Sequence, residues 1–529
     1  MRIKTYHIRM AKGAGFALAA VVFWTLLLAA CSSATAPSSE PAAAPAPEAA
    51  ASAPAAAQPA ASPPQQPLKV DPVQGYVGDK FTIVGEGLPP GKEVELQWVA
   101  WEAAYVTNVI PDNVEYVERK YSQKRVPLGR AVPDAQGRLS AVFPVPEDHG
   151  EAHDIFAVID GKDVAKGGFR IMRSVEVSSA KGAVGAPITI TVKGMATSYY
   201  QSTMSVLWDN HYVGFISTVT TKGTGIAQIR AAGPVGDHIV QVHSASQAMP
   251  YLNSQDNSRN WYMFSHLPDK FVYTVTEDRG ATEPVTEWPE DSRVAKVGPS
   301  TPRTTASSPS PASLAAAVVE PASGPVFSNA TLRSDGLPPN ADVELVFVTA
   351  RGNRTSGSGW VMDVLPLGKA KTESNGSLQS TFKVPDDLGG WHTIKVMAGD
   401  KLLSEVPYYV ERSLVQVTPR KVKAGETITI QLKGIGWTEL DNGVAVTYDN
   451  SYFGYACGFS SNGTINLLIP ATGGKGTHLI DIYPMVYEGH PNKQVFNFQV
   501  PQLTAFQDHP GLALGYRFPI FRVAVEVTD

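Results

Sequence analysis

The sequence is poor in cysteine and in charged residues. It has 2 cysteines among 529 residues, too few for a disulfide framework or a Cys-rich metal site. Charged residues make up 18 %, below the roughly 25 % usual in soluble domains. A formal net charge of −5 lacks the positive excess of a nucleic-acid binder. We therefore expect no nucleic-acid partner.

Helical periodicity and enzyme signatures are also missing. After residue 30, apolar residues do not recur at helical spacing over more than about ten residues. The sequence has no His-Glu-x-x-His, no Gly-x-Ser-x-Gly, no phosphate-binding loop and no dinucleotide-binding glycine pattern. We predict a protein that is not an enzyme, with no catalytic residues, no metal and no cofactor.

The N-terminus has the pattern of an export signal. Residues 1–12 carry basic and no acidic side chains, and 14–30 form an uncharged apolar run. This run is short for a membrane span, which needs about 20 residues. It ends in Leu28-Ala29-Ala30-Cys31, which resembles the lipobox of bacterial lipoproteins. The resemblance implies removal of 1–30, lipidation of Cys31 and a membrane partner reached through acyl chains. It also implies a place in the cell envelope, at the outer membrane or the cell surface.

Two segments have the composition of linkers. After Cys31, the stretch 31–67 is almost entirely Ala, Pro, Ser, Thr and Gln, which cannot bury a core. We interpret it as a disordered stalk. The stretch 279–316 is rich in Thr, Ser, Pro and Ala and reads as an interdomain linker.

The rest of the sequence consists of two copies of one repeated unit. Pro146-x-Asp148-x-Gly150-x-x-His153 recurs as Pro385-x-Asp387-x-Gly389-x-x-His392, and Trp208-Asp209-Asn210-x-Tyr212 recurs as Tyr448-Asp449-Asn450-x-Tyr452. The first copy is longer between Pro90 and Pro127, and the second is longer after His478. Each copy divides near an Arg-Ser pair. We expect four modules: A1 (68–173), B1 (174–278), A2 (317–412) and B2 (413–529).

Short alternating strands fill these modules. Runs such as Ile188-Thr-Ile190-Thr-Val192 place apolar side chains on one face, and Gly-containing turns separate the runs about every ten residues. The pattern predicts an all-β protein of β-sandwiches. A Gly-Asp or Gly-Glu turn, an alternating strand and a glycine, as at Gly78–Gly87 and Gly425–Gly436, resemble bacterial Ig-like domains of the IPT/TIG type. The resemblance implies four Ig-like β-sandwiches in two duplicated pairs.

Three polar patterns have both a functional and a structural interpretation. Equivalent histidines (His153, His238, His392 and His478) would be ligands or bases, or would bond backbone carbonyls and pin a loop. The Asp-Asn pairs at 209–210 and 449–450 would bind calcium or form tight turns. Cys457 would be a nucleophile or a buried structural thiol. In each case we favour the structural interpretation.

Aromatic residues in long inserts are the candidate ligand contacts. The insert 98–126 includes Trp101, Tyr105 and Tyr116, and a late segment of B1 includes Trp261 and Tyr262. Such rings stack on sugars or anchor a protein partner. The alternative is that the inserts cap their own sandwich or join neighbouring modules.

These features predict a non-catalytic, lipid-anchored binding protein of the cell envelope. Rigid modules on a tether favour adhesion or scaffolding through an envelope protein. The alternative is capture of an extracellular glycan for a separate hydrolase, which depends on the aromatic inserts.

Overall fold

The computed structural model describes residues 66–529 except 111–112, 198–201, 247, 253–267, 281–313, 353–359, 487–498, 506 and 517. All of these residues lie in the second of two units, 1–63 and 64–529. The signal sequence, Cys31, nearly all of the stalk and linker, and the rings of Trp261 and Tyr262 lie outside the described residues.

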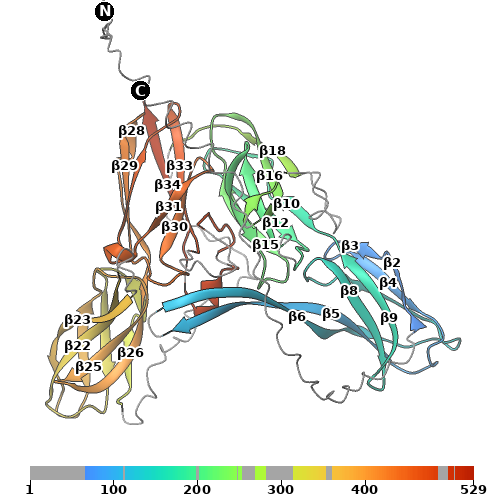
Figure 1. The fold of residues 1–529 in the computed structure, drawn as a ribbon, viewed down its shortest axis with the longest axis horizontal. Helices are drawn as coiled ribbons and strands as arrows, with labels where there is room; N and C mark the ends of the chain where they lie inside the picture. Colours follow the sequence, from blue (N-terminus) through green and yellow to red (C-terminus); the bar gives the residue numbers. More distant parts are fainter. Residues whose placement is uncertain are drawn as a thin grey trace, which may run out of the picture. The chain divides into compact units, whose positions relative to one another are not determined.

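The first pair of modules is built of strands (Figure 1). A1 contains β1 (Gln66–Pro67), β2 (Lys69–Asp71), β3 (Gln74–Gly75), β4 (Lys80–Gly85), β5 (Val94–Ile110), β6 (Asn113–Ala131), β7 (Leu139–Pro144), β8 (Glu151–Ile159) and β9 (Lys162–Ile171). B1 contains β10 (Ser174–Val177), β11 (Lys181–Gly182), β12 (Pro187–Lys193), β13 (Thr203–Trp208), β14 (His211–Ser217), β15 (Gly225–Arg230), β16 (Gly236–Ser246), β17 (Met249–Pro250) and β18 (Asp269–Val275).

The second pair repeats this order. A2 contains β19 (Ala317–Glu320), β20 (Ser323–Pro325), β21 (Asn329–Ser334), β22 (Asp342–Gly352), β23 (Trp360–Lys371), β24 (Leu378–Lys383), β25 (Gly390–Ala398) and β26 (Lys401–Glu411). B2 contains β27 (Ser413–Thr418), β28 (Lys421–Lys423), β29 (Thr427–Lys433), β30 (Gly443–Tyr448), β31 (Ser451–Cys457), η1 (Phe459–Ser461), β32 (Ile465–Pro470), β33 (Gly476–Pro484), η2 (Pro510–Leu514) and β34 (Phe521–Thr528). Within the described ranges the only helices are these two short 3₁₀ turns.

Each module pairs a three-stranded sheet with a larger one. The small sheets are β2-β4-β7, β10-β12-β15, β19-β21-β24 and β27-β29-β32. The larger sheets are β1-β9-β8-β5-β6, β11-β18-β16-β13-β14, β20-β26-β25-β22-β23 and β28-β34-β33-β30-β31. In each larger sheet an early short strand lies parallel to the last strand, and in A1 both β1 and β3 do so; the other pairs are antiparallel. This two-sheet order is the Ig-like sandwich, so the predicted fold class is confirmed.

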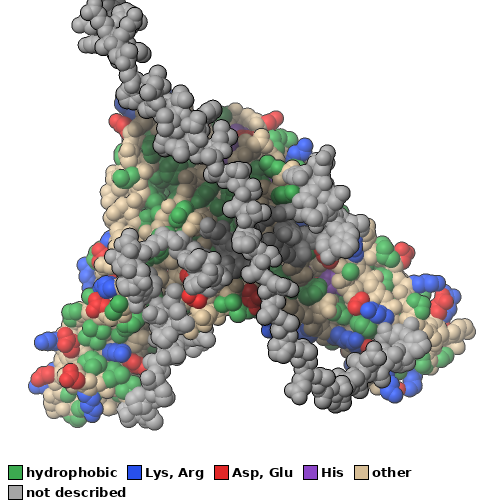
Figure 2. Space-filling model, in the orientation of Figure 1, with side chains coloured by type: hydrophobic (Ala, Val, Ile, Leu, Met, Phe, Trp, Pro, Cys, Tyr) green, Lys and Arg blue, Asp and Glu red, His purple; other side chains and the backbone are tan. Residues whose placement is uncertain are grey.

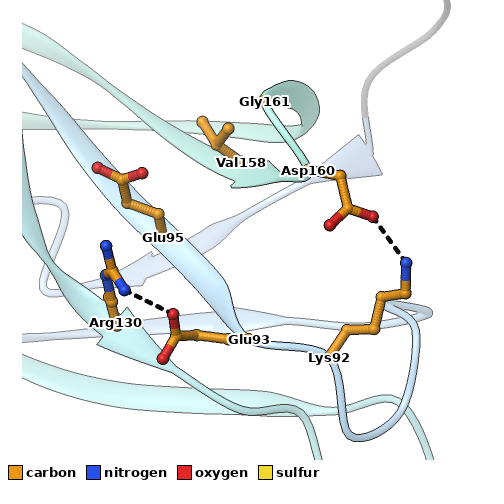
Figure 3. Close-up of a pocket in the computed structure, with 7 residues that line it drawn as sticks. All are labelled: Lys92, Glu93, Glu95, Arg130, Val158, Asp160 and Gly161. Atoms are coloured by element: carbon orange, nitrogen blue, oxygen red, sulfur yellow. Dashed lines mark hydrogen bonds and ion pairs between the residues drawn. The ribbon is translucent and has the colours of Figure 1, made fainter.

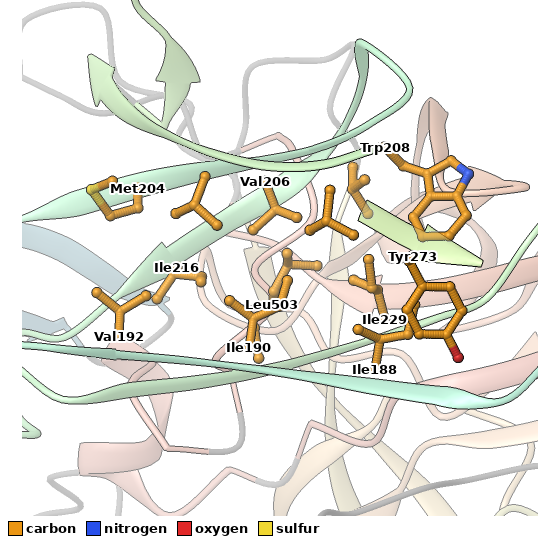
Figure 4. Packing of buried hydrophobic residues seen from close by; sticks show 14 of the residues in the cluster. Ile188, Ile190, Val192, Met204, Val206, Trp208, Ile216, Ile229, Tyr273 and Leu503 are labelled. Carbon is orange, nitrogen blue, oxygen red and sulfur yellow. The ribbon is translucent and has the colours of Figure 1, made fainter. Parts of the chain in front are cut away.

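Period-two alternation builds the core of every sandwich. In β12 the side chains of Ile188, Ile190 and Val192 are fully buried, and the residues between them face outward. They pack against the facing sheet through Val206 and its neighbours (Figure 4). Leu503 of B2 also lies in this B1 cluster, so the two cores are continuous at that point.

The long insert of A1 is a β-ribbon. β5 and β6 span 17 and 19 residues, whereas β22 and β23 of A2 span 11 and 12. β8 pairs with β5 only from Glu95 to Trp98. Beyond that point the two strands continue as a hairpin that leaves the A1 sandwich.

Close backbone contacts join each A module to its B module. A Cβ atom on Gly150 would lie 2.1 Å from the carbonyl oxygen of Gly194, and one on Gly389 would lie 1.7 Å from that of Gly434. No side chain fits at either distance. Glycine recurs at both junctions because only glycine allows this approach.

B1 and B2 share an interface that contains a buried ion pair. The guanidinium of Arg230 in B1 pairs with the carboxylate of Asp481 in B2, and both side chains are almost completely buried. Arg230 also donates to the carbonyl oxygen of Val523 at 2.9 Å. Asn450 donates from its amide to the carbonyl oxygen of Arg230 at 2.6 Å. The Val523 carbonyl thus replaces water that the guanidinium loses, and the Asn450 bond ties the two modules at the backbone.

Removing one partner of this pair destabilises the B1–B2 interface. We expect Arg230→Ala or Asp481→Ala to cost about 3–5 kcal/mol, because each leaves a buried charge without its counter-ion. The double substitution Arg230→Met with Asp481→Leu costs much less, since no charge is stranded. Calorimetry of the B1–B2 transition measures the difference. Equal losses in the single and double variants would contradict this account.

Candidate functional site

A histidine occupies the same place in all four sandwiches, near the start of the strand that pairs with the last one. In each module its Nε2 lies near the carbonyl oxygen of the residue four positions earlier. The pairs are His153–His149 (2.7 Å), His238–Pro234 (2.8 Å), His392–Leu388 (2.9 Å) and His478–Gly474 (2.8 Å). The structural interpretation of these histidines is confirmed: each pins the loop before its strand.

The second ring nitrogen ties the histidine to the neighbouring strand. In the A modules, Nδ1 of His153 and His392 lies 2.9 Å from a carbonyl oxygen of β5 or β22. In the B modules, Nδ1 of His238 lies 2.5 Å from the Asp209 carboxylate, and Nδ1 of His478 lies 2.6 Å from that of Asp449. Each ring thus lies between two oxygen atoms of its own module.

Each histidine also stacks on an aromatic ring of that neighbouring strand. The ring centroids are 4.3–5.6 Å apart, for the pairs His153–Trp98, His238–Trp208, His392–Phe347 and His478–Tyr448. Other Ig-like domains bury a tryptophan at this position against a disulfide between the sheets. Here the histidine takes the place beside the ring.

The Asp-Asn pairs form two-residue turns. Asp209 and Asn210 have φ of 49° and 65°, and Asp449 and Asn450 have 47° and 59°. Both pairs link adjacent strands through the left-handed turn that favours Asn and Asp. The turn interpretation is therefore confirmed. Cys457 ends β31 and is half-buried.

The hairpin of A1 buries two of the predicted ligand-contact rings. Tyr105 and Tyr116 pack with Phe215 and Val219 of B1 and with Leu440 of B2. Tyr116 is completely buried and Tyr105 is 9 % exposed. Both rings therefore pack between modules, as the alternative interpretation of the insert expects. The insert continues two strands as a ribbon, and the ribbon rests on other modules.

The carboxylate of Asp508 bonds this hairpin and B1 together. Asp508 of B2 accepts a hydrogen bond from the Tyr105 hydroxyl at 3.1 Å and one from the Val219 N–H at 2.7 Å. It also accepts from both the backbone and the hydroxyl of Thr220, at 2.9 and 2.8 Å. A1, B1 and B2 therefore meet at one buried carboxylate whose acceptor sites are filled.

The late segment of B2 also contacts neighbouring modules. The N–H of Phe215 on the edge strand β14 donates to Pro501, and the N–H of Leu503 donates to Phe215, at 3.0 and 2.9 Å. Tyr516 and Phe518 from the same segment pack against Tyr409 of A2. The interpretation that this segment joins neighbouring modules is confirmed for its described residues.

Trp101 lies on β5 and is half-buried. Of the candidate ligand contacts among the described residues, it is the one that stays partly accessible. Its backbone N–H donates to the buried carboxylate of Asp148 at 3.2 Å, and the indole N–H of Trp98 donates to the same carboxylate at 3.0 Å. Trp261 and Tyr262 lie outside the described residues.

Two groups at the A2–B2 junction have strongly shifted pKa values. Burial raises the pKa of Asp441 to about 6, and burial lowers the pKa of His509 to about 3. Each residue is 2 % exposed. His509 stacks on Phe518 and accepts from the Gly511 N–H at 3.0 Å. Shifted pKa values often mark reaction centres, but here their cause is the packing of the junction.

An open hollow of about 350 Å³ lies at the loop end of A1, lined by Lys92, Glu93, Glu95, Arg130, Val158, Asp160 and Gly161 (Figure 3). Lys92 pairs with Asp160 and Arg130 pairs with Glu93, both at 2.7 Å. The lining thus holds two ion pairs and one further carboxylate, that of Glu95. Exposed pairs of this kind contribute about 0–1 kcal/mol.

The visible surface shows no gathering of one charge. In Figure 2, basic, acidic and hydrophobic side chains are interspersed over the coloured part of this face. Among the described residues, no group of three or more His, Cys, Asp or Glu side chains could hold a metal ion. In the same residues, no helix has the length and apolar character needed to span a membrane.

Comparison with known proteins finds solved structures of low similarity. No family model matches, and no curated protein matches. Salmonella alpha-2-macroglobulin reacted with methylamine is similar at 10 % identity, over 88 % of this chain and 31 % of that chain, with a TM-score of 0.16. The D1–D4 fragment of ICAM-5 matches at 10 % identity, over 87 % and 99 %, with a TM-score of 0.17. Domains 3 and 4 of rat CD4 match at 10 % identity, over 38 % and 97 %, with a TM-score of 0.16.

The strand order defines this chain as a tandem array of Ig-like domains. The likeness to these solved structures concerns the fold, and we derive no activity or partner from it.

Replacing Asp508 releases the A1 hairpin. Asp508→Ala leaves the Tyr105 hydroxyl and the Val219 N–H buried without this acceptor, at about 1–3 kcal/mol each. We expect faster amide exchange in 103–116 and 217–220, measured by mass spectrometry. Tyr105→Phe removes one bond and costs about 1 kcal/mol. Asp134→Ala, in an exposed turn of A1, is the control. Unchanged exchange in Asp508→Ala would contradict the role of this carboxylate.

His478 makes the stability of B2 depend on pH. Its hydrogen bond to Asp449 raises the pKa of His478 above 6.5, and Asp278 adds to this effect. Stabilisation by the protonated ring is fully present below about pH 6.5 and is lost as the pH rises through the higher folded-state pKa. We expect His478→Gln to lower the melting temperature more at about pH 5.5 than at about pH 9. A loss that does not change with pH would refute this.

Proposed function

We propose that this protein is a non-catalytic binding scaffold, exported and held in the bacterial cell envelope by a lipid on Cys31. The observation that carries the proposal is that the polar side chains that recur in every module bond to the protein itself. The four equivalent histidines are bonded to the protein's own backbone or to a turn aspartate. Side chains bonded in this way make each module rigid. This arrangement favours a binding function over a catalytic one.

Bracing between modules supports the same conclusion. Glycine contacts join each A module to its B module, and Asp508 connects A1, B1 and B2. A braced array presents its surfaces at fixed positions, which lowers the conformational cost of engaging a large partner. The apolar run 14–30 ending at Cys31 and the Ala/Pro-rich stretch to 67 supply the anchor and the stalk.

Substitution of Cys31 tests the anchor. We expect Cys31→Ser to move most of the protein from the membrane fraction to the soluble fraction and to abolish incorporation of labelled fatty acid, because no acyl chain is attached. Cys457→Ser is the matched control and stays in the membrane fraction. Membrane retention of the Cys31→Ser protein would exclude lipid anchoring.

Two binding assays on the Cys31→Ser chain test the binding function. We expect pull-down from an envelope extract to recover a discrete protein partner, and a glycan array to show no retention. Retention on the array that is lost in Trp101→Ala would replace this proposal with polysaccharide capture. Failure of both assays would count against a binding function.

A further inference from the structure

The two A modules differ at one edge of their larger sheets. In A1 the edge strand β6 carries Ser122, Gln123, Lys124 and Arg125, and the equivalent positions of β23 in A2 carry Val361, Met362, Asp363 and Val364. The equivalence follows from the register. The next residue along β6 lies opposite Trp98, and the next along β23 lies opposite Phe347, the two rings that stack on the module histidines.

The A1 edge is protected by charge. Lys124 pairs with Glu102 at 3.0 Å. Arg125 forms two bonds to Asp163, at 2.7 and 2.9 Å, and its guanidinium lies 3.8 Å from the centre of the Phe156 ring. Lysine and arginine on an edge strand oppose pairing with another strand, since both would lose water and meet like charges.

The A2 edge lacks this protection. Val361, Met362 and Val364 are 62 %, 47 % and 54 % exposed. The intervening Asp363 lies 3.3 Å from Arg351, which also forms two bonds to Asp387, at 2.7 and 2.9 Å, so one acidic side chain remains in this run. Among the described strands, β23 pairs with β22 alone, so its outer backbone groups face away from the sheet. Since A1 folds with polar residues at these positions, the fold itself does not require apolar ones.

In B1, the equivalent edge is already extended by another segment of the chain. The equivalent strand of B1, β14, receives the segment 501–503 of B2 through backbone hydrogen bonds at Phe215. The corresponding edge of an Ig-like module in this protein therefore accepts an extended segment. In A2 the same kind of edge is apolar and not extended by any described strand.

We propose that β23 pairs edge to edge with β23 of a second molecule of this protein, in antiparallel orientation about a two-fold axis. Two identical edges of this kind are self-complementary: apolar side chains meet apolar side chains, and both rows of backbone groups are satisfied at once. Pairing of the A1 edge with its own copy would instead remove water from its charged side chains. The inference rests on the proposed binding function and names a second copy as a partner.

The contact is short, so the dimer is weak. One edge pairing buries less than the roughly 1,200–2,000 Å² of a stable interface. We expect dissociation in the range of about 10–100 µM in solution. Tethering of both molecules to one membrane raises their effective concentration and favours the dimer.

Sedimentation of the Cys31→Ser chain at about 10–300 µM tests the proposal. We expect a monomer–dimer equilibrium that the double variant Met362→Gln with Val364→Arg weakens at least tenfold. These are the residues that A1 carries at the same positions, so the fold tolerates them, and melting temperature verifies this. Val318→Arg is the matched control, since Val318 is equally exposed, at 54 %, on the other sheet of A2.

A covalent probe locates the contact. In the Cys457→Ser background, Met362→Cys should give a disulfide-linked dimer on mild oxidation, and Val318→Cys should not. A monomer at the highest concentration, or a dimer unaffected by the double variant, would overturn the proposal. Pull-down of an envelope protein by the double variant reports separately on the proposed binding function, so either idea can fail alone.

Discussion

One contact recurs in every sandwich and the rest of the structure is built around it. A histidine bonds the carbonyl oxygen four residues earlier, stacks on an aromatic ring of the adjacent strand, and bonds that strand or its turn. It fixes the loop before its strand without a disulfide. In A1 and A2 this loop contains the residues around Gly150 and Gly389, which make the closest contacts to the B modules. The orientation of each pair therefore depends on the pinned loop.

The two copies differ in segments that lie outside this shared histidine contact. Extra length in A1 extends a ribbon to Asp508, and extra length in B2 supplies Asp508 itself and the segment along β14. The two insertions meet at the same carboxylate. The two copies share four similar sandwiches, and the additional segments join them. The edge of A2, which carries apolar residues where A1 carries polar ones, is a third difference, and it lies at the surface.

The sequence was sufficient for the fold class because alternation and turns are local properties. Ile188, Ile190 and Val192 face one side of β12 whatever lies elsewhere in the chain. The turn at Asp209–Asn210 was predictable for the same reason, since these residues tolerate positive φ. The histidines were predictable because a residue repeated in four modules meets a requirement of the fold.

The positions of Tyr105 and Tyr116 were decided by the tertiary structure alone. An aromatic ring on a long insert faces either water or another module, and local sequence is the same in both cases. Tyr105 meets its acceptor 403 residues away, and Tyr116 receives support from Glu439, 323 residues away. The sequence determined the number and type of the sandwiches through the repeat and its alternation. Which surfaces remain open followed from contacts between distant segments, because burial depends on what packs against a strand and not on the strand itself.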